Sequence, residues 1–175
     1  AFILAKLVHE FGHGYAVKRF GGEVHVMGIT FLVFTPIPYV DATAAWAFRE
    51  RWKRIWVGAA GMIVELVLAS LATFIWANTG PGLFNSWCFN LMLVASVSTI
   101  LFNINPRLKF DGDYILSDLT DSPNLQSRSM RELGHLVERY AFGGQHSQSP
   151  AVGRGDSIWL SLFGVASWFF RVYIT

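Results

Sequence analysis

The chain has 175 residues, of which 53% are hydrophobic and 15% are charged, and its net charge is +2 at pH 7. Soluble domains carry about 25% charged residues, so this composition favours a membrane protein over a soluble one. A nucleic-acid-binding protein needs a dense basic patch, whereas the basic residues here are sorted by loop, which argues against a nucleic-acid partner.

Four apolar stretches predict helices buried in lipid or in protein, at residues 1–17, 56–77, 87–104 and 158–174. A membrane-crossing helix needs about 20 residues, so the second and third stretches are long enough and the fourth is borderline. The first is short, and because the chain opens inside it we expect a fragment of a longer protein. The expected fold is a mainly α membrane protein, one domain over residues 1–175, with about four transmembrane or membrane-embedded helices.

The first stretch contains His9, Glu10 and His13 in the spacing HExxH. Residues four apart lie on one face of an α-helix, so the two imidazoles can bind one zinc ion with Glu10 beside it. A carboxylate in that place can take a proton from water and pass it to a leaving amine. The other interpretation is a pair of surface histidines, but ionisable residues in an apolar helix are costly to bury unless they bind something.

Residues 23–40 are rich in β-branched and aromatic side chains, with glycines before them and prolines near their end, which predicts a small β-hairpin region. Within a membrane such strands must be covered by protein or line a cavity. A free strand edge could receive an extended substrate peptide, and a purely structural flap is the equal alternative.

Basic residues predict an orientation, because they lie in the loops before the second and fourth apolar stretches and are absent from residues 78–86. By the positive-inside rule, both basic loops face the cytoplasm. His13 lies about 7 Å along the helix from Lys18, so the active site is expected near the cytoplasmic side. The basic residues of these two loops are Lys18, Arg19, Arg49, Arg51, Lys53 and Arg54, and then Arg107, Lys109, Arg128, Arg131, Arg139 and Arg154.

A third zinc ligand is needed beside two histidines, and Asp111 is the favoured candidate. It follows Pro106, which breaks the third apolar helix, and precedes Gly112, which permits a tight turn, so its carboxylate is expected at the depth of His13. Glu65 is next in line, but it lies mid-span at another depth. The remaining candidates are loop histidines: His25, His135 and His146.

Residues 121–157 are polar and are expected to form a cytoplasmic loop. Within them, residues 128–142 have helical spacing, and an apolar face predicts an amphipathic helix lying along the membrane. Residues 143–150 have the composition of a flexible linker, and His135 and His146 are expected to be solvated. The expected apolar face comprises Leu133, Leu136, Val137 and Tyr140.

Two motifs together, HEFGH at residues 9–13 and NPRLKFDG at residues 105–112, resemble the site-2 protease family of intramembrane zinc metalloproteases. The resemblance runs over most of residues 1–125. Within the family, the sequence is similar to bacterial members described as peptide zinc metalloproteases. It implies Zn²⁺ as the cofactor, His9, His13 and Asp111 as its ligands, and Glu10 as the catalytic acid and base. It also implies that Asn105 assists in the transition state.

Two positions depart from the family pattern. Residues 61–65 read GMIVE where many members have GPxxN, and we expect Glu65 to be a protonated carboxyl that is hydrogen-bonded inside the bundle. Asp113 stands where related sequences often carry an aromatic residue, and we expect it to face solvent. Glu65 could instead pair with a lysine or contact a cationic substrate.

The resulting expectation is a zinc-dependent intramembrane endopeptidase in the lipid bilayer of a bacterial cell membrane, which hydrolyses membrane-anchored proteins or peptides. A soluble-type zincin whose third ligand is a glutamate remains an alternative. So does a non-proteolytic membrane scaffold or peptide-export accessory that retains the zinc site. The sequence does not identify the substrate or the oligomeric state.

Overall fold

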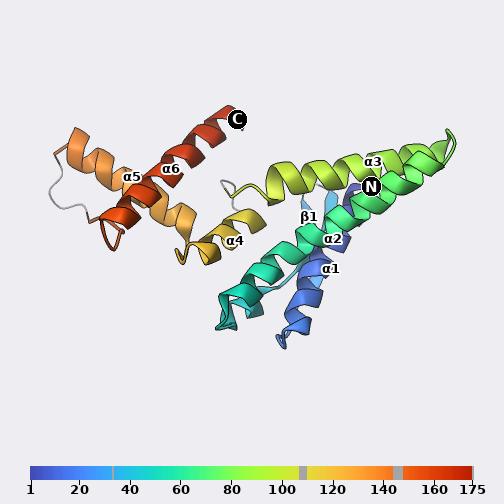
Figure 1. Cartoon of the computed structure of the whole chain (residues 1–175), viewed down its shortest axis with the longest axis horizontal. Helices are drawn as coiled ribbons and strands as arrows, with labels where there is room; N and C mark the ends of the chain where they lie inside the picture. The colour runs from blue at the N-terminus through green and yellow to red at the C-terminus, as the bar shows by residue number, and fades with distance from the viewer. Residues whose placement is uncertain (33, 107–109, 144–147, 175) are drawn as a thin grey trace. The chain divides into compact units, whose positions relative to one another are not determined.

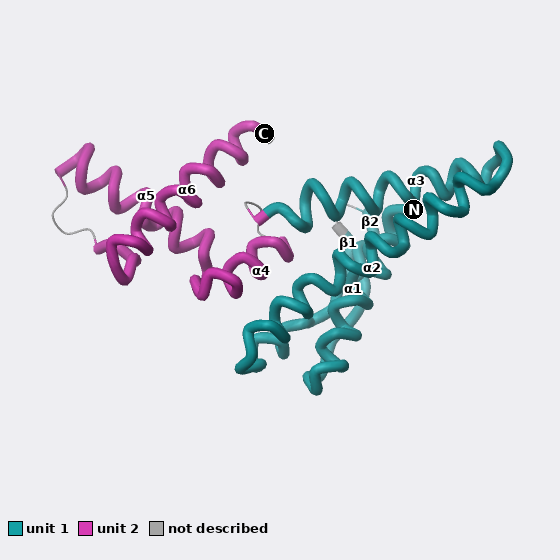
Figure 2. The backbone as a smooth tube through the Cα atoms, in the orientation of Figure 1, with its two compact units in different colours: residues 1–105 teal, residues 106–175 magenta. Residues whose placement is uncertain are grey.

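The structure, a computed structural model, describes residues 1–32, 34–106, 110–143 and 148–174 (Figure 1). Two expected features lie partly outside the described residues: the linker, with His146, and the NPRLKFDG segment, with Arg107 and Lys109. The chain is mostly helical and divides into two compact units, residues 1–105 and 106–175, which Figure 2 distinguishes by colour.

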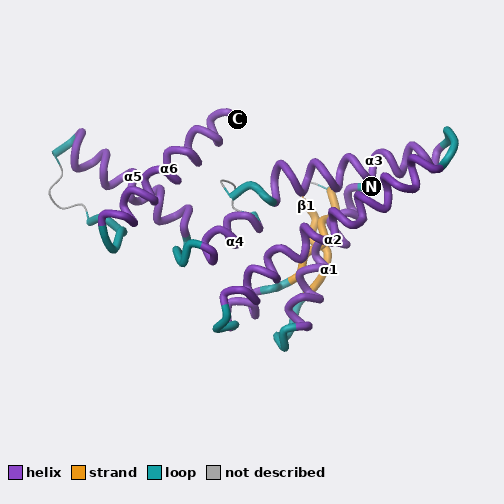
Figure 3. The backbone as a smooth tube through the Cα atoms, viewed as in Figure 1, coloured by secondary structure: helices purple, strands orange, loops and turns teal. Residues whose placement is uncertain are grey.

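The first unit contains three long helices and a two-stranded sheet (Figure 3). Its core lies where α1 and α3 pack against α2, and small side chains dominate there, as is usual where helices pack closely in a membrane. This core comprises Ala5, Ala69, Ala72, Leu91 and Ala95. The elements of the unit are α1 (Phe2–Arg19), β1 (Met27–Leu32), β2 (Thr35–Val40), η1 (Thr43–Ala47), α2 (Arg51–Asn78), α3 (Leu83–Val97) and η2 (Ser98–Asn103).

Helix α1 ends where glycine allows the backbone to turn. Gly21 has a φ of +84°, and its N–H donates to the carbonyl of Lys18, while the N–H of Gly22 donates to the carbonyl of Val17. These two bonds form a Schellman motif, which satisfies carbonyls that the helix leaves without partners. The chain therefore leaves the helix sharply and can return along it as the hairpin.

The expected hairpin is present, and its register fixes which backbone groups face outward. Strands β1 and β2 are antiparallel, with Ile29 opposite Pro38. The N–H of Asp41 donates to the carbonyl of Val26, so the alternation of an antiparallel ladder makes the Ile29 and Pro38 pair a non-hydrogen-bonded one. The N–H and carbonyl groups of Met27, Ile29 and Phe31 consequently point to the outer edge of β1.

Helix α2 and the continuous helix formed by α3 and η2 are long and apolar enough to cross a membrane. Within the described residues the same criteria select no other helix. Helix α1 carries Lys6, His9, Glu10 and His13 among its apolar residues, and α6 has 21 residues. Two candidate spans are thus present, while helices form at all four of the expected stretches.

The second unit consists of α4 (Asp111–Leu119), α5 (Leu125–Ala141) and α6 (Arg154–Ile174). Helix α5 begins before the expected residue 128, and its buried residues are mostly polar. Glu132 is 1% exposed and accepts hydrogen bonds from the hydroxyls of Ser149 and Ser157, which tie α5 to the start of α6. Of the expected apolar face, Val137 and Tyr140 are exposed, so they do not contribute to this packing.

The expectation of a solvated loop at His135 is wrong, because this residue lies within α5 and is 7% exposed. Helical spacing explains the burial: His135 lies three residues after Glu132, on the same face of the helix. The expectation that Asp113 faces solvent is also wrong, because this residue lies in the first turn of α4 and is 4% exposed.

Candidate metal centre

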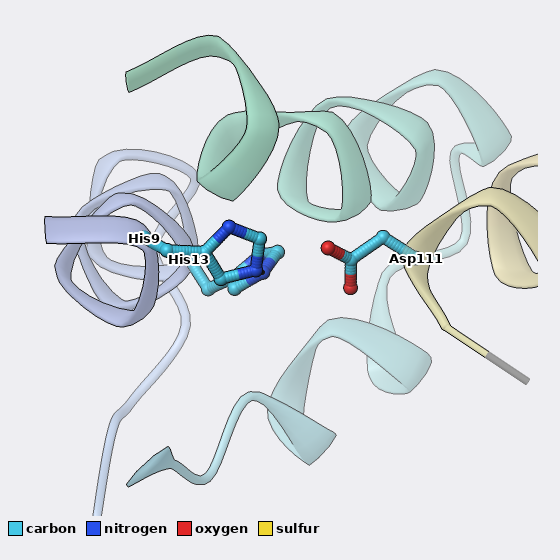
Figure 4. A group of neighbouring side chains, drawn as sticks. All are labelled: His9, His13 and Asp111. Carbon is cyan, nitrogen blue, oxygen red and sulfur yellow. Dashed lines mark hydrogen bonds between the residues drawn. The ribbon is translucent and has the colours of Figure 1, made fainter. Parts of the chain in front are cut away.

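The two histidines of the HExxH segment lie one turn apart on the buried face of α1, and their rings project from the same side of the helix (Figure 4). The Nε2 atom of His13 lies 3.1 Å from the Nε2 atom of His9. The ring centroids are 4.7 Å apart, and the ring planes are inclined by 80°. One nitrogen of each imidazole is therefore directed at a common point.

The other nitrogen of each ring is held by an acceptor on α2. The Nδ1 atom of His13 lies 2.7 Å from the backbone oxygen of Val57, and the Nδ1 atom of His9 lies 2.9 Å from Oε2 of Glu65. A carbonyl or carboxylate oxygen can only accept, so each Nδ1 carries the proton and each neutral ring has its lone pair on Nε2. Two lone pairs directed at each other across 3.1 Å repel unless a cation lies between them.

The spacing of these atoms fits a zinc site. Zn–N bonds of about 2.05 Å at a tetrahedral angle place two nitrogen ligands about 3.3 Å apart, close to the separation of the two Nε2 atoms. Neutral imidazoles whose second nitrogen donates to a carbonyl or a carboxylate are the usual form of histidine ligands. The tautomers and the convergence of the rings are thus those of a metal-binding pair.

Gly61 of α2 leaves the space that this pair occupies. A Cβ atom at position 61 would lie 2.4 Å from Nε2 of His13 and 2.8 Å from Cε1 of His9. Four residues earlier on the same helix, Val57 provides the carbonyl that His13 binds. The face of α2 that lies against the histidines therefore offers a hydrogen-bond acceptor at Val57 and space for the rings at Gly61.

Glu10 is held by the end of the hairpin. Its Oε2 atom accepts a hydrogen bond of 3.1 Å from the N–H of Val40. Val40 is the last residue of β2, and its N–H points away from β1, as the register requires. The hairpin therefore orients the carboxylate that the sequence assigns to acid and base catalysis.

Glu65 is buried against the same histidine pair, at 0% exposure. Its Oε2 atom accepts from Thr99 Oγ1 at 2.8 Å and Asn103 Nδ2 at 3.1 Å, as well as from His9, and Oε1 lies 3.3 Å from Nζ of Lys6. All four partners are donors, which suits an ionised carboxylate and does not fit the expected protonated carboxyl. The pairing with a lysine, which the sequence left open, is present.

Thr99 and Asn103 were not singled out by the sequence and belong to η2, a π-helical turn at the end of α3. The N–H of Ile104 donates to the carbonyl of Thr99, five residues earlier. Such wide turns are rare and are often found at functional sites. Pro106, two residues beyond Ile104, signals only that the helix ends there.

The remaining candidate residues are Asn105, Asp111 and His25. Asn105 follows η2, is partly buried and ends the first unit, and Asp111 is the first residue of α4 in the second unit and is partly buried. Their roles at the zinc stay predictions. His25 is exposed and lies 3.4 Å from Glu23, as expected of a surface histidine.

Comparison with known proteins gives two matches and one absence. Residues 1–86 match the family model described as "Peptidase family M50". The chain is 31% identical over 117 residues to the Bacillus subtilis (strain 168) protein named "Putative peptide zinc metalloprotease protein YydH". That alignment covers 66% of this chain and 44% of the relative, so the chain spans less than half of the relative's length. No solved structure matches the chain.

Proposed function

From the match of residues 1–86 to peptidase family M50, the site-2 protease family, we propose that the chain is a member of this family and an intramembrane zinc endopeptidase. Its substrates would be membrane-anchored proteins or peptides. The family and the name of the Bacillus subtilis relative both support a zinc metalloprotease. The observation that carries the proposal is the convergence of the two Nε2 atoms of His9 and His13, in the HExxH segment that also contains Glu10.

The proposed ligand set is His9, His13 and Asp111, because the two histidines of the HExxH segment and the aspartate of the NPRLKFDG segment each offer one ligand atom. Two imidazoles and a carboxylate leave the fourth position of a tetrahedral site for water, as a catalytic zinc requires. Asp111 is the first residue of α4 and is followed by Gly112, so regular helical backbone holds the carboxylate.

Zinc bound by these residues supplies Lewis acidity, which makes water acidic near neutral pH and polarises the peptide carbonyl. Glu10 takes the proton from the attacking water and returns it to the leaving amine. The N–H of Val40 holds one carboxylate oxygen of Glu10 in place for this transfer. Asn105 donates a hydrogen bond to the developing oxyanion, and loss of one such donor costs about 3 kcal/mol.

The substrate is proposed to bind as an extended strand along β1. Pro36 and Pro38 occupy the outward-facing positions of β2 and have no N–H to donate, and the N–H of Val40 is bonded to Glu10. The outer edge of β1 offers both donors and acceptors at Met27, Ile29 and Phe31. A paired strand there anchors the substrate while the residues that follow it reach the site.

Location in a membrane is supported by the side chains that α2 leaves exposed. Val67, Leu71 and Phe74 are 54%, 56% and 69% exposed. A core helix of a soluble zincin would bury such residues, whereas lipid covers them at no cost. The finer proposals of about four membrane-embedded helices, a bacterial cell membrane and a site near the cytoplasmic side are supported by the apolar stretches and the sorted basic loops.

Zinc content and cleavage together test the proposed function. The protein purified in detergent is expected to contain one zinc per polypeptide and to cleave a membrane-anchored peptide, and Asp111→Ala is expected to lose most of the zinc. Unchanged zinc in Asp111→Ala would contradict the ligand set. Zinc in the parent without cleavage of any candidate substrate would favour the non-proteolytic scaffold, and absence of zinc from the parent would refute a metal-dependent protease.

A further inference from the structure

We infer that Glu65 is a positioning residue for His9, which fixes the tautomer and the direction of this ligand from the side of the ring opposite the metal. This inference rests on the proposed zinc site and adds a residue to it. Position 65 departs from the pattern of the resembled family, so the role follows from the contacts of this chain alone.

The geometry excludes Glu65 from direct ligation of a metal that both Nε2 atoms share. Its Oε2 atom lies 2.9 Å from Nδ1 of His9, whereas Nε2 of His9 is directed at His13. The two nitrogens of one imidazole point to opposite sides of the ring, so a group bound at Nδ1 lies behind the ligand and not beside the metal. A carboxylate in this place raises the basicity of the ligand and holds its orientation.

The same carboxylate is itself fixed from two other elements. Thr99 and Asn103 of η2 donate to Oε2, and Lys6 of α1 pairs with Oε1. Lys6 lies three residues before His9 on α1, so the cation and the ligand that share Glu65 are on one helix face. A buried charge that lacked such partners would be strongly destabilising.

Gly61 and Glu65 lie on the same face of α2. The two residues are one turn apart, and Gly61 gives space to the imidazoles while Glu65 binds the back of one of them. Helix α2 thus supplies acceptors to both histidines, from the carbonyl of Val57 and from the side chain of Glu65. Two donors on Oε2 besides His9 leave this carboxylate little freedom to turn toward the metal.

The test measures metal binding directly, in the full chain purified in detergent. Affinities for Zn²⁺ are obtained by competition with a chelator, and Co²⁺ provides an absorption spectrum that reports the coordination geometry. Glu65→Gln is expected to weaken zinc binding about 10- to 100-fold while the tetrahedral cobalt spectrum is retained. Glu50→Gln is the matched control, because Glu50 pairs with Lys53 at the exposed start of the same helix.

The double variant Lys6→Met with Glu65→Gln separates ligand positioning from the burial of an unpaired lysine. Removal of both charges is expected to restore thermal stability toward that of the parent and to leave the zinc affinity low. Recovery of zinc affinity in the double variant would overturn the inference, because the defect would then belong to Lys6. A parent-like affinity in Glu65→Gln would overturn it as well.

Three outcomes distinguish this inference from the proposed function. Loss of the tetrahedral spectrum in Glu65→Gln with its retention in Asp111→Ala would make Glu65 a ligand and overturn the positioning role. Absence of metal from the parent would overturn the proposed function and this inference together. Tight binding by the parent with no effect of Glu65→Gln would overturn the inference alone.

Discussion

Replacement of Gly61 by alanine is expected to disrupt the metal site without changing any proposed ligand. The added Cβ would lie 2.4 Å from Nε2 of His13, whereas ordinary contacts begin at 3.4 Å, so the ring must move by 3.4 − 2.4 = 1.0 Å. A displacement of that size would break the 2.7 Å bond between Nδ1 of His13 and the carbonyl of Val57. It would also separate the two Nε2 atoms.

The expected magnitude combines opposing effects. Overpacking of this kind costs about 1–3 kcal/mol, and the lost hydrogen bond costs about 1 kcal/mol. Alanine recovers at most about 1 kcal/mol through its higher helix propensity. We therefore expect a net destabilisation of about 1–3 kcal/mol and, because 1 Å of misplacement can cost about 100-fold in catalysis, a loss of cleavage of that order.

The assay compares zinc affinity, thermal unfolding in detergent and cleavage between the parent and Gly61→Ala. Gly134→Ala on α5 is the matched control, because an added Cβ there would meet nothing within 4 Å. The control should keep its zinc affinity. A Gly61→Ala protein that binds zinc as tightly as the parent and unfolds at the same temperature would refute the packing argument.

Three further predictions concern the base, the hairpin and the end of α1. Glu10→Gln should retain zinc and abolish cleavage, since an amide cannot carry the proton, and wild-type cleavage in this variant would contradict the role of Glu10. Ile29→Pro should retain zinc and reduce cleavage because it removes an outward N–H from β1, with Ile29→Ala as the control that keeps this N–H; unchanged cleavage would exclude strand pairing at β1. Gly21→Ala should lower the unfolding temperature in a thermal melt by the equivalent of about 1 kcal/mol, because the φ of Gly21 is +84°, whereas Gly80→Ala, with nothing near its Cβ, should not.

Local patterns in the sequence predicted the parts of the site that depend on spacing along one element. The HExxH segment predicted that His9 and His13 share a helix face, and glycines, β-branched residues and prolines predicted the hairpin between α1 and α2. The contact between Glu65 and His9 joins residues 56 positions apart, and the HExxH spacing along α1 does not specify such a pairing. The spacing of Gly61 and Glu65 on one face of α2 is a signal that could have indicated it.

Burial on α5 was mispredicted at His135, because this histidine was expected to lie in a solvated loop. The helix instead buries Ser129, Glu132 and His135, and Glu132 is satisfied by Ser149 and Ser157. A polar residue can be buried when its partners are nearby, and the partners of Glu132 come from segments 17 and 25 residues later. The spacing of apolar residues predicts that α5 is a helix, but these distant contacts determine which of its faces is buried.

The wide turn of η2 makes part of this site depend on the number of residues in the chain and not only on their identity. A π-turn closes its hydrogen bond over one residue more than an α-turn does. Deletion of one residue between Thr99 and Asn103 would convert the wide turn into an α-turn and change the relative direction of the two side chains that donate to Glu65. Among relatives, a one-residue gap in η2 should therefore accompany the loss of the glutamate at position 65, a correlation that inspection of substitutions alone would miss.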